Sequence, residues 1–364
     1  MRVVLDWVHL QDQADLRFHF ALASEGPLAG WVAANGIPHT VAPMPWFGWS
    51  GVLKSATAVI GLAARARRWN IDVVHSEHNV YPFAVAVAAL IRRPIVCAAH
   101  FLLDRGFVEW AFTGWRRPNQ LIWTSHAQQA ACREALAGIL PEERQTVIPL
   151  GVNLERFGND TGSRASLRRA WGAASDTIVV GQANAIRPGK RVEDFLQLVR
   201  ELRTRDPRVL GVIAGTPSKG DEQYAAEMRA LTTTLGLDQH CLWLGNLEPV
   251  EPFLHAIDVF VSTSEYETFG MSICEAMACS RPVAVYRAGA PGEVVGDAGL
   301  VVETEDLAAL VGAVRSLVDN ADLRSALGQK ARERVEAVFN PRSSLQTLAR
   351  LYRSLDAART GSSS

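Results

Sequence analysis

Short apolar runs alternate along the chain with longer segments whose apolar residues recur at helical spacing. The runs are rich in Val, Ile and aromatic residues, and several are almost continuously hydrophobic, which is typical of strands covered on both faces. We expect strands at residues 17–23, 39–44, 72–77, 94–100, 120–126 and 146–151, and again at 177–183, 209–215, 240–245, 258–264, 282–288 and 299–303. This alternation predicts an α/β protein with parallel sheets and right-handed crossovers.

A polar stretch, NLERFGNDTGSRAS at residues 153–166, divides the predicted strands into two sets of six. The 364 residues exceed one typical core, so the pattern predicts two similar α/β domains. We place an N-terminal domain at residues 1–157 and a C-terminal domain at residues 158–338. Residues 339–364 are expected to form a last helix after Pro341 and a loose tail.

The chain opens with a helical pattern rather than a strand. Val3, Val4, Trp7 and Val8 recur at the spacing of one helix face. A doubly wound domain normally opens with a strand and a Gly-rich loop that lead into its first helix, and neither precedes this helix. Either the domain is built differently, or the chain starts inside an otherwise longer protein.

Composition and charge narrow the function classes. With 37 Lys and Arg against 38 Asp and Glu, the formal net charge is -1, which gives no indication of nucleic-acid binding. No signal-peptide pattern and no run of 18 apolar residues is found, so we expect a cytoplasmic protein. The five cysteines lie mostly inside apolar runs, and we interpret them as buried thiols rather than zinc ligands.

The stretch SEYETFGMSICEAMACS, residues 264–280, places two glutamates around a Phe-Gly pair. It follows a predicted strand and leads into a helix expected to begin near Gly270 or Met271, so it lies at the carboxyl edge of a sheet, where α/β proteins bind ligands. The free N–H groups at that helix start suit a phosphate or a sugar hydroxyl. We expect Glu267 to face the ligand and Glu275 to accept a hydroxyl pair such as that of a ribose. The alternative is that Glu275 only favours the helix dipole and Glu267 is a solvated loop acid.

Seven residues separate Glu267 from Glu275, and this segment resembles the Glu-x7-Glu signature of retaining GT-B glycosyltransferases in glycosyltransferase family 4. Further segments resemble the same family in the same order, at residues 147–157, 186–199, 212–237, 290–314 and 331–340. The second half is covered almost continuously and the first half more loosely. The resemblance implies two Rossmann-like domains with parallel sheets facing across a cleft, the acceptor on the N-terminal side and the nucleotide sugar on the C-terminal side. The last helix is then expected to cross back to the N-terminal domain.

The resemblance also assigns roles on the donor side. It implies that Glu267 faces the donor sugar, that Glu275 binds the ribose, and that Lys190 holds the diphosphate, where a cation stabilises the leaving group. Further donor contacts are expected around the helix start, at Phe269, Gly270, Met271 and Ser272. Five residues before the lysine the family usually has an arginine, whereas this chain has Ala185, and Arg187 or Arg191 is the candidate for the missing charge. The alternative for Lys190 is a solvated loop residue.

Three histidines are candidates on the acceptor side. His100 ends the predicted strand at residues 94–100, where the family places a histidine near the reacting carbon, and it joins Glu267 and Lys190 as a catalytic candidate. His75 and His78 end another predicted strand and are candidates for binding acceptor hydroxyls. Each of these histidines can equally be structural.

The function implied by the resemblance is a retaining transferase that moves a hexose from a UDP- or GDP-sugar to a hydroxyl of a carbohydrate, lipid-linked or small-molecule acceptor. No cofactor and no metal is expected, because the chain has no Asp-x-Asp pair suited to a metal and GT-B enzymes generally need none. No nucleic-acid partner is expected. Two alternatives stay open, a catalytically impaired GT-B protein that acts as a binding subunit, and a nucleotide-sugar epimerase or phosphorylase of the same fold.

Two further expectations concern the N-terminal domain. Family members open with a strand and a Gly-rich loop, so the resemblance implies that both are missing ahead of the first helix. Trp46, Phe47 and Trp49, with the basic segment at residues 65–70, are compatible with a peripheral contact at the inner membrane surface. The basic residues also suit a helix C-terminus without any membrane.

Overall fold

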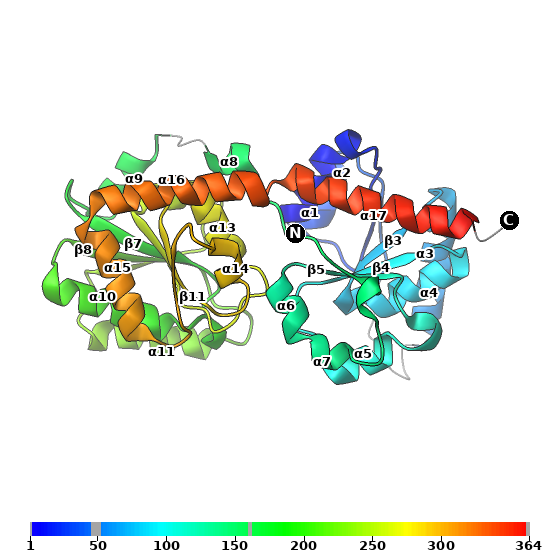
Figure 1. Cartoon of the computed structure of the whole chain (residues 1–364), viewed down its shortest axis with the longest axis horizontal. Coiled ribbons are helices and arrows are strands. Elements are labelled where there is room, and N and C mark those ends of the chain that lie inside the picture. Colours follow the sequence, from blue (N-terminus) through cyan, green and yellow to red (C-terminus); the bar gives the residue numbers. More distant parts are fainter. Residues whose placement is uncertain (1, 45–51, 159–161, 362–364) are drawn as a thin grey trace. The chain divides into compact units, whose positions relative to one another are not determined.

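The structure is a computed structural model that describes residues 2–44, 52–158 and 162–361. The chain divides into two units, and Figure 1 labels the elements of both. Unit 1 comprises Met1–Gly151 and Pro341–Ser364, and unit 2 comprises Val152–Asn340. Trp46, Phe47 and Trp49 lie outside the described residues.

Unit 1 contains two parallel sheets. β1 (Phe20–Leu22) pairs with β2 (His39–Val41), and a separate sheet has the order β3 (Val74–Glu77), β4 (Ile95–Ala99), β5 (Gln120–Trp123) and β6 (Gln145–Val147). The α-helices are α1 (Arg2–Leu10), α2 (Pro27–Ala34), α3 (Val52–Arg68), α4 (Tyr81–Ile91), α5 (Arg105–Ala111), α6 (His126–Ala131), α7 (Arg133–Leu136) and α17 (Pro341–Gly361). Short 3-10 turns are η1 (Gln11–Ala14), η3 (His78–Val80), η4 (Gly114–Arg116) and η5 (Glu142–Arg144).

Unit 2 is built on one parallel sheet with the order β12-β11-β10-β7-β8-β9. Its strands are β7 (Ile178–Ala183), β8 (Val209–Ala214), β9 (Cys241–Gly245), β10 (Val259–Ser262), β11 (Val283–Tyr286) and β12 (Leu300–Val302). Its helices are α8 (Leu154–Gly158), α9 (Arg164–Ala170), η6 (Pro188–Lys190), α10 (Val192–Arg205), α11 (Glu222–Thr234), α12 (Glu251–Ala256), α13 (Met271–Ala278), α14 (Pro291–Val295), α15 (Leu307–Asp319) and α16 (Ala321–Val338).

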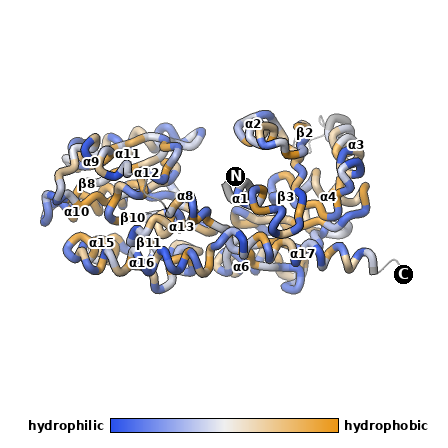
Figure 2. Tube along the Cα trace, turned by 90° about the horizontal axis from the view of Figure 1, so that it is seen from above, coloured by the Kyte–Doolittle hydropathy of each residue, from blue (hydrophilic) through white to orange (hydrophobic). Residues whose placement is uncertain are grey.

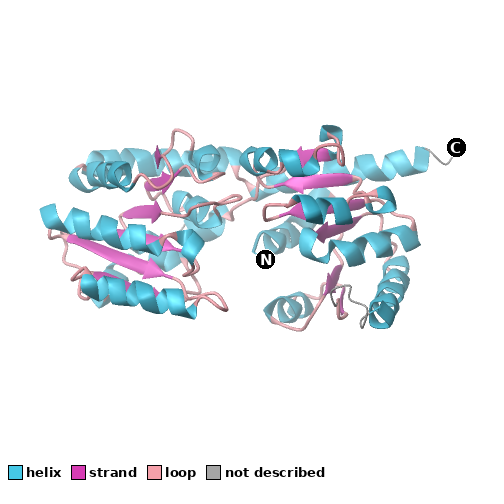
Figure 3. Cartoon of the chain, turned by 90° about the horizontal axis from the view of Figure 1, so that it is seen from below, coloured by secondary structure: helices cyan, strands magenta, loops and turns pink. Residues whose placement is uncertain are grey.

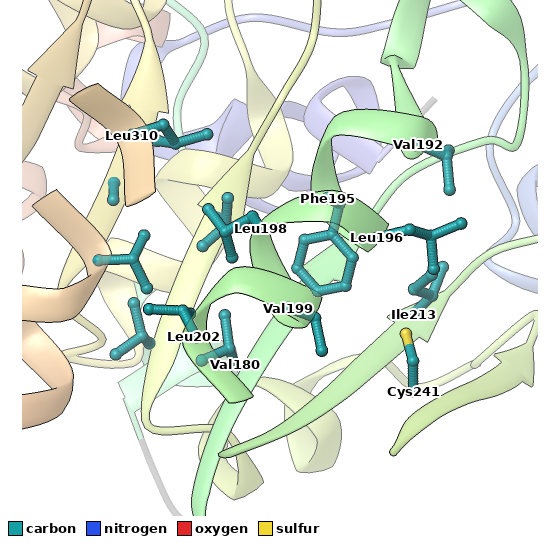
Figure 4. Packing of buried hydrophobic residues seen from close by; sticks show 14 of the residues in the cluster. Val180, Val192, Phe195, Leu196, Leu198, Val199, Leu202, Ile213, Cys241 and Leu310 are labelled. Atoms are coloured by element: carbon teal, nitrogen blue, oxygen red, sulfur yellow. The ribbon is translucent and has the colours of Figure 1, made fainter. Parts of the chain in front are cut away.

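The core of unit 2 follows from the spacing of apolar residues on α10. Phe195, Leu198, Val199 and Leu202 recur at three- and four-residue intervals, so they form one face of the helix, and all four are buried. Figure 4 shows them with Val180 of β7 in a cluster that also includes residues of α11 and α15. Burial of each such side chain contributes roughly 1.5–3 kcal/mol of transfer free energy, so this face of the sheet anchors the unit.

A partly buried ionic cluster fixes α9 to the sheet of unit 2. Asp258, at the start of β10, accepts hydrogen bonds from Arg164 Nη2 at 2.5 Å, Arg168 Nη1 at 2.8 Å and the Val179 backbone N–H at 2.8 Å. Burial alone would raise the pKa of Asp258, but the Val179 hydrogen bond and the two arginines outweigh it and hold the pKa below its usual value. The polar segment before β7 is therefore tied to β10 through charge.

The strands and the first helix predicted from the hydrophobic pattern are confirmed. Each of the twelve predicted runs overlaps a strand, and α1 covers the predicted opening helix. The first six strands nevertheless form two sheets instead of one, because among the described residues no strand lies between β1 and β3. The tail predicted to be loose is helical as far as Gly361.

Two further expectations concern the cysteines and the membrane. All five cysteines are free and buried, as predicted, and burial raises the pKa of Cys241 to about 12. Within the part of the chain that the structure describes, no helix has both the length and the apolar character needed to cross a bilayer.

Candidate active site

The carboxyl ends of β7, β10 and β11 bring three loops together at one edge of the unit 2 sheet. These loops are residues 184–191, 263–270 and 287–290. β7 pairs with β10 and β10 with β11 in parallel, so their C-terminal loops must lie on the same side. This edge is where open α/β sheets bind ligands.

Lys190 and Glu267 meet at this edge. The Lys190 Nζ atom lies 2.5 Å from Glu267 Oε1, and the Ser264 hydroxyl donates to the same carboxylate oxygen at 2.8 Å. Lys190 is only 8% exposed, which excludes the solvated-loop alternative for this lysine in the described structure. A charge-assisted pair in such a partly enclosed position is stronger than one at the surface.

Backbone contacts hold this pair in place. The Thr263 hydroxyl donates to the Lys190 carbonyl at 2.9 Å, and the Glu265 N–H donates to the Gly189 carbonyl at 3.0 Å, so the loops after β7 and β10 are joined directly. Glu267 in turn donates through its N–H to Ala288 at 2.8 Å and accepts from Ala290 at 3.0 Å. The position of its carboxylate is therefore set by both neighbouring loops.

Gly289 permits the last of these contacts. Its φ is +86°, a conformation that favours glycine, and a Cβ placed there would lie 2.7 Å from the Glu267 carbonyl oxygen and 2.8 Å from the Tyr266 ring. The loop after β11 can approach Glu267 this closely only because residue 289 has no side chain.

The helix α13 begins at Met271, within the region expected for its start. Gly270 precedes it with a φ of +97°, and no side chain caps the helix, so its first N–H groups are available to a ligand. Phe269 is buried, with its ring 5.4 Å from that of Phe339, so only its backbone can contribute to binding. Met271 and Ser272 are partly exposed.

Glu275 lies in the second turn of α13 and is 7% exposed. A glutamate so enclosed is unusual for a residue that would merely favour a helix dipole, since an exposed position in the first turn serves that purpose without desolvation. Its burial indicates a specific role in unit 2.

The two arginines considered as replacements for the charge lost at Ala185 differ in availability. Arg191 is committed to Asp194 at 2.8 Å and to Glu305 at 3.1 Å, and these hydrogen bonds and charges raise its pKa. Arg187 is exposed; its backbone carbonyl accepts from the Lys190 N–H at 2.9 Å, and no hydrogen bond or ion pair joins its side chain to another described residue. Of the two, Arg187 is the one free to contact a ligand.

In unit 1, the three predicted histidines lie on or just after β3 and β4. His100 follows β4, and its Nε2 atom lies 4.0 Å from Glu77 Oε1. Desolvation lowers the pKa of His100, although Glu77 opposes the shift. Desolvation also lowers the pKa of His78, whose ring packs edge-on against Phe101 and Phe107.

His75 differs from the other two because it already has a partner. Its Nδ1 atom lies 2.6 Å from the Tyr352 hydroxyl of α17, which ties β3 to the last helix. Desolvation, followed by the neighbouring His100, lowers the pKa of His75 to about 4. His75 is exposed at the surface, so it is desolvated by the protein atoms around its ring and not by full burial of the side chain. Only its Nε2 atom remains for an acceptor hydroxyl.

Several residues of the site were not predicted. Thr263 and Ser264 follow the end of β10 and directly precede the Glu267 motif. Their position at the end of a strand was the sequence signal that could have identified them as site residues. Gln182 of β7 is 1% exposed, accepts from Thr263 at 3.3 Å, and its Nε2 atom has no partner among the described residues. Gly289 and Tyr352 gave no local signal, because their importance depends on distant neighbours.

No group of three or more His, Cys, Asp or Glu residues suited to a metal is found among the described residues. The ammonium group of Lys190 supplies a cation at the candidate site.

Comparisons with known families agree with both units. Residues 2–156 match the family described as Glycosyltransferase Family 4, and residues 163–334 match Glycosyl transferases group 1.

Among individual proteins, the chain is 33% identical to a D-inositol 3-phosphate glycosyltransferase of Saccharomonospora viridis, over 83% of this chain and 69% of that protein. Two further relatives of that description are covered over 58% and 52% of their own length, so the chain spans little more than half of them. A lipopolysaccharide core biosynthesis mannosyltransferase of Rhizobium leguminosarum is 25% identical over 93% of this chain and 89% of that protein.

The fold is similar to a solved structure, Anabaena Alr3699/HepE in complex with UDP-glucose. The TM-score is 0.82 at 20% identity, with 97% of this chain and 95% of that chain covered. The predicted α/β fold class of the GT-B type is thereby confirmed.

Proposed function

Because the chain belongs to the group 1, family 4 glycosyltransferases, we propose that it transfers a hexose from a nucleotide-diphosphate sugar to an acceptor hydroxyl with retention of configuration. The observation that carries this proposal is the contact between Lys190 and Glu267 beside the uncapped start of α13. A cation and free N–H groups suit a diphosphate, and a carboxylate suits sugar hydroxyls.

Each group then has a defined task. Lys190, which can donate three hydrogen bonds, keeps its contact with Glu267 and also donates to the diphosphate. Glu267 accepts hydrogen bonds from the hexose, and Glu275 accepts them from the ribose. Gly270 lets the diphosphate approach the N–H groups of Met271 and Ser272, and Arg187 supplies charge that Ala185 does not.

The reaction that fits these groups keeps atoms and charge in balance. The bond between the sugar C1 and the phosphate oxygen breaks, and its electron pair stays on the diphosphate. The acceptor oxygen bonds to C1 from the face that the diphosphate leaves, and the acceptor proton passes to a phosphate oxygen. Lys190 and the α13 N–H groups stabilise the negative charge that develops on the diphosphate.

The donor and acceptor classes are inferred from the printed names of similar proteins. A fold neighbour binds UDP-glucose, and the relatives include a mannosyltransferase and inositol-phosphate glycosyltransferases, so a UDP- or GDP-hexose is the proposed donor. His75, His78 and His100 are the proposed contacts for the acceptor in unit 1. Lowered pKa values favour neutral imidazoles at pH 7, which can both donate and accept hydrogen bonds with a hydroxyl.

A panel of UDP-, GDP- and ADP-sugars tests the proposal. We expect one class to bind with micromolar to millimolar affinity by calorimetry and to be slowly hydrolysed without an acceptor, with release of nucleoside diphosphate. The same donor should lose binding in Glu275→Ala. Failure of every nucleotide sugar to bind would refute the proposal.

A second candidate, a binding subunit without catalysis, is favoured by Ala185 at the position where the family usually has arginine. The same panel separates the two candidates. Donor binding without hydrolysis, and without transfer to any of a set of carbohydrate and lipid-linked acceptors, would favour the binding subunit.

A further inference from the structure

A cavity of about 500 Å³ lies in unit 1 beside the amino ends of β5 and β6. Its lining includes Arg117, just before β5, and residues from α6, α7 and the segment that leads into β6. The strands of this sheet, drawn in magenta in Figure 3, are parallel, so His78 and His100, which follow β3 and β4, lie at the opposite edge. The cavity is therefore separate from the proposed acceptor contacts.

The size and the apolar part of the lining suit a small molecule. Small-molecule sites typically have volumes of roughly 300–1,000 Å³ and combine apolar side chains with a few polar groups. Leu136, Ile139 and Leu140 line the cavity and are buried. Figure 2 shows hydrophobic and hydrophilic residues interspersed along the trace of unit 1, so polar groups lie close to such apolar positions.

Hydrogen bonds hold the walls of the cavity in place. Arg105 Nη1 donates to the carbonyl of Ala137, which lines the cavity, at 2.8 Å. Gln145, another lining residue, donates to the Leu140 carbonyl at 3.1 Å and accepts from the Trp123 indole N–H at 3.0 Å. The walls are thus preformed, as those of most ligand sites are.

Two arginines of the lining have side chains that are not committed elsewhere. Arg117 and Arg133 are exposed, and within the described part of the chain no hydrogen bond or ion pair joins either side chain to another group. Two other arginines of this region, Arg105 and Arg144, donate to backbone carbonyls instead. Arg117 and Arg133 are therefore available to a ligand in the cavity.

The charge of the lining favours an anion. Among the described residues that line the cavity, Arg117 and Arg133 are opposed by one acid, Glu142. Guanidinium groups match the geometry of phosphate oxygens and bind them through paired hydrogen bonds. Gln129 also lines the cavity, and its side-chain amide can donate further hydrogen bonds.

We propose that this cavity binds a small phosphorylated molecule, with its phosphate on Arg117 and Arg133 and its organic part against Leu136 and Leu140. A phosphate ion alone would leave most of a cavity of about 500 Å³ unfilled, which favours a phosphate attached to an organic group. The site lies outside the donor loops of unit 2, so its ligand is additional to the nucleotide sugar.

Hydrogen exchange of the 364-residue chain tests the proposal with four probes at equal ionic strength. These are glucose 6-phosphate, glucose 1-phosphate, inorganic phosphate and glucose. At about ten times the Kd of a sugar phosphate, peptides from residues 133–145 should exchange roughly tenfold more slowly, because binding suppresses local opening. Inorganic phosphate should protect the same peptides with a higher Kd, and glucose should not protect them.

Three results would overturn the proposal. One is the absence of protection by all three phosphate compounds, and another is equal protection by glucose, which would show that the phosphate is not recognised. The third is protection by inorganic phosphate without protection by either sugar phosphate, which would indicate a site for the free ion.

A double variant, Arg117→Gln with Arg133→Gln, tests the two arginines directly. Hydrogen bonds to charged groups are worth about 1.5–3 kcal/mol, so the Kd of the sugar phosphate should rise at least about tenfold. Arg68→Gln, at an exposed arginine of α3, is the matched control and should keep the original Kd. Both proteins should keep the thermal unfolding transition, because the replaced side chains are exposed.

The donor site of unit 2 is a second place where a phosphate can bind. Any protection of peptides that contain Met271 should persist in the double variant, which separates the two sites within one experiment. Unchanged protection of residues 133–145 in the double variant would overturn the proposal.

Discussion

Lys190 and Glu267 stand 77 positions apart in the sequence, and their side chains meet at 2.5 Å. The sequence indicated that each residue belongs to a donor site, but it could not indicate that they contact each other. That contact depends on the loops after β7 and β10 being joined through Thr263 and Glu265. In the same way, the pairing of His75 with Tyr352 spans 277 positions and had no sequence signal.

Replacement of Lys190 and of Glu275 by alanine should affect different steps. In the proposed mechanism Lys190 stabilises the leaving diphosphate, so we expect Lys190→Ala to lower kcat roughly 100- to 1000-fold. In the same proposal Glu275 binds the ribose in the ground state through hydrogen bonds worth about 1.5–3 kcal/mol, so in Glu275→Ala the donor Kd should rise about 10- to 100-fold. Initial rates and calorimetry measure both effects.

A surface lysine is the control for this pair of variants. Lys330 forms an exposed ion pair with Asp297 on unit 2, so Lys330→Ala should leave both kcat and donor Kd unchanged. Unaltered donor affinity and turnover in both site variants would contradict the assigned roles.

The elements themselves were largely predictable because their signals are local. Nearly continuous apolar runs such as IVCAA in β4 predict strands covered on both faces, and the spacing on α1 predicts a helix. The division of the first six strands into two sheets was not predictable from such runs. Each strand has the same local pattern whether or not a neighbour pairs with its other edge.

Gly289→Ala tests how closely the loop after β11 controls Glu267. The added Cβ meets the Glu267 carbonyl at 2.7 Å, so the Glu267 segment must shift, and a displacement near 1 Å can cost about 100-fold in rate. We expect kcat/KM to fall by at least about tenfold, while far-UV circular dichroism stays native.

Gly236→Ala is the matched control. Gly236 also has a positive φ, +67°, but a Cβ there meets nothing within 4 Å. Both variants should lose about 1–2 kcal/mol of stability from backbone strain, and only Gly289→Ala should lose activity. Equal kinetics in the two variants would show that the contact with Glu267 is unimportant.

Asp258→Asn tests the ionic cluster that holds α9 to the sheet. The substitution leaves Arg168, whose side chain is 12% exposed, without its charged partner, and we expect the free energy of unfolding to fall by about 3 kcal/mol. Asp297→Asn, which breaks an exposed pair that solvent screens, should leave the free energy of unfolding nearly unchanged.

The pH dependence of unfolding gives a second measure of the same cluster. The pKa of Asp258 is lower in the folded protein than in the unfolded chain, so its stabilisation is complete above the unfolded pKa of about 4 and is lost as the pH falls through the folded value. Urea unfolding between pH 3 and 7 should therefore show a smaller acid-induced loss in Asp258→Asn. An equal loss in both proteins would contradict this account.

At the scale of the whole molecule, the two units differ in continuity. Unit 2 is one uninterrupted stretch of chain with a complete sheet and its own core, whereas unit 1 requires α17 from the far end of the chain. Leu345, Leu348 and Ala349 of α17 are buried, and Arg353 donates to the Ala14 carbonyl at 2.6 Å. The sequence predicted a last helix that belongs with the first domain, and no local pattern specified which residues it would bury.

Residues 152–340 should consequently fold without the rest of the chain. We expect this fragment to unfold in one cooperative thermal transition, because its six strands are all paired within it. Residues 1–151 should not show such a transition, because the apolar surface that α17 covers is then exposed. Covalent addition of residues 341–364 to residues 1–151 through a flexible linker should restore it. Calorimetry of the three fragments tests whether the two units are stabilised separately. Non-cooperative unfolding of the 152–340 fragment would contradict this prediction, and so would a cooperative transition of residues 1–151 alone.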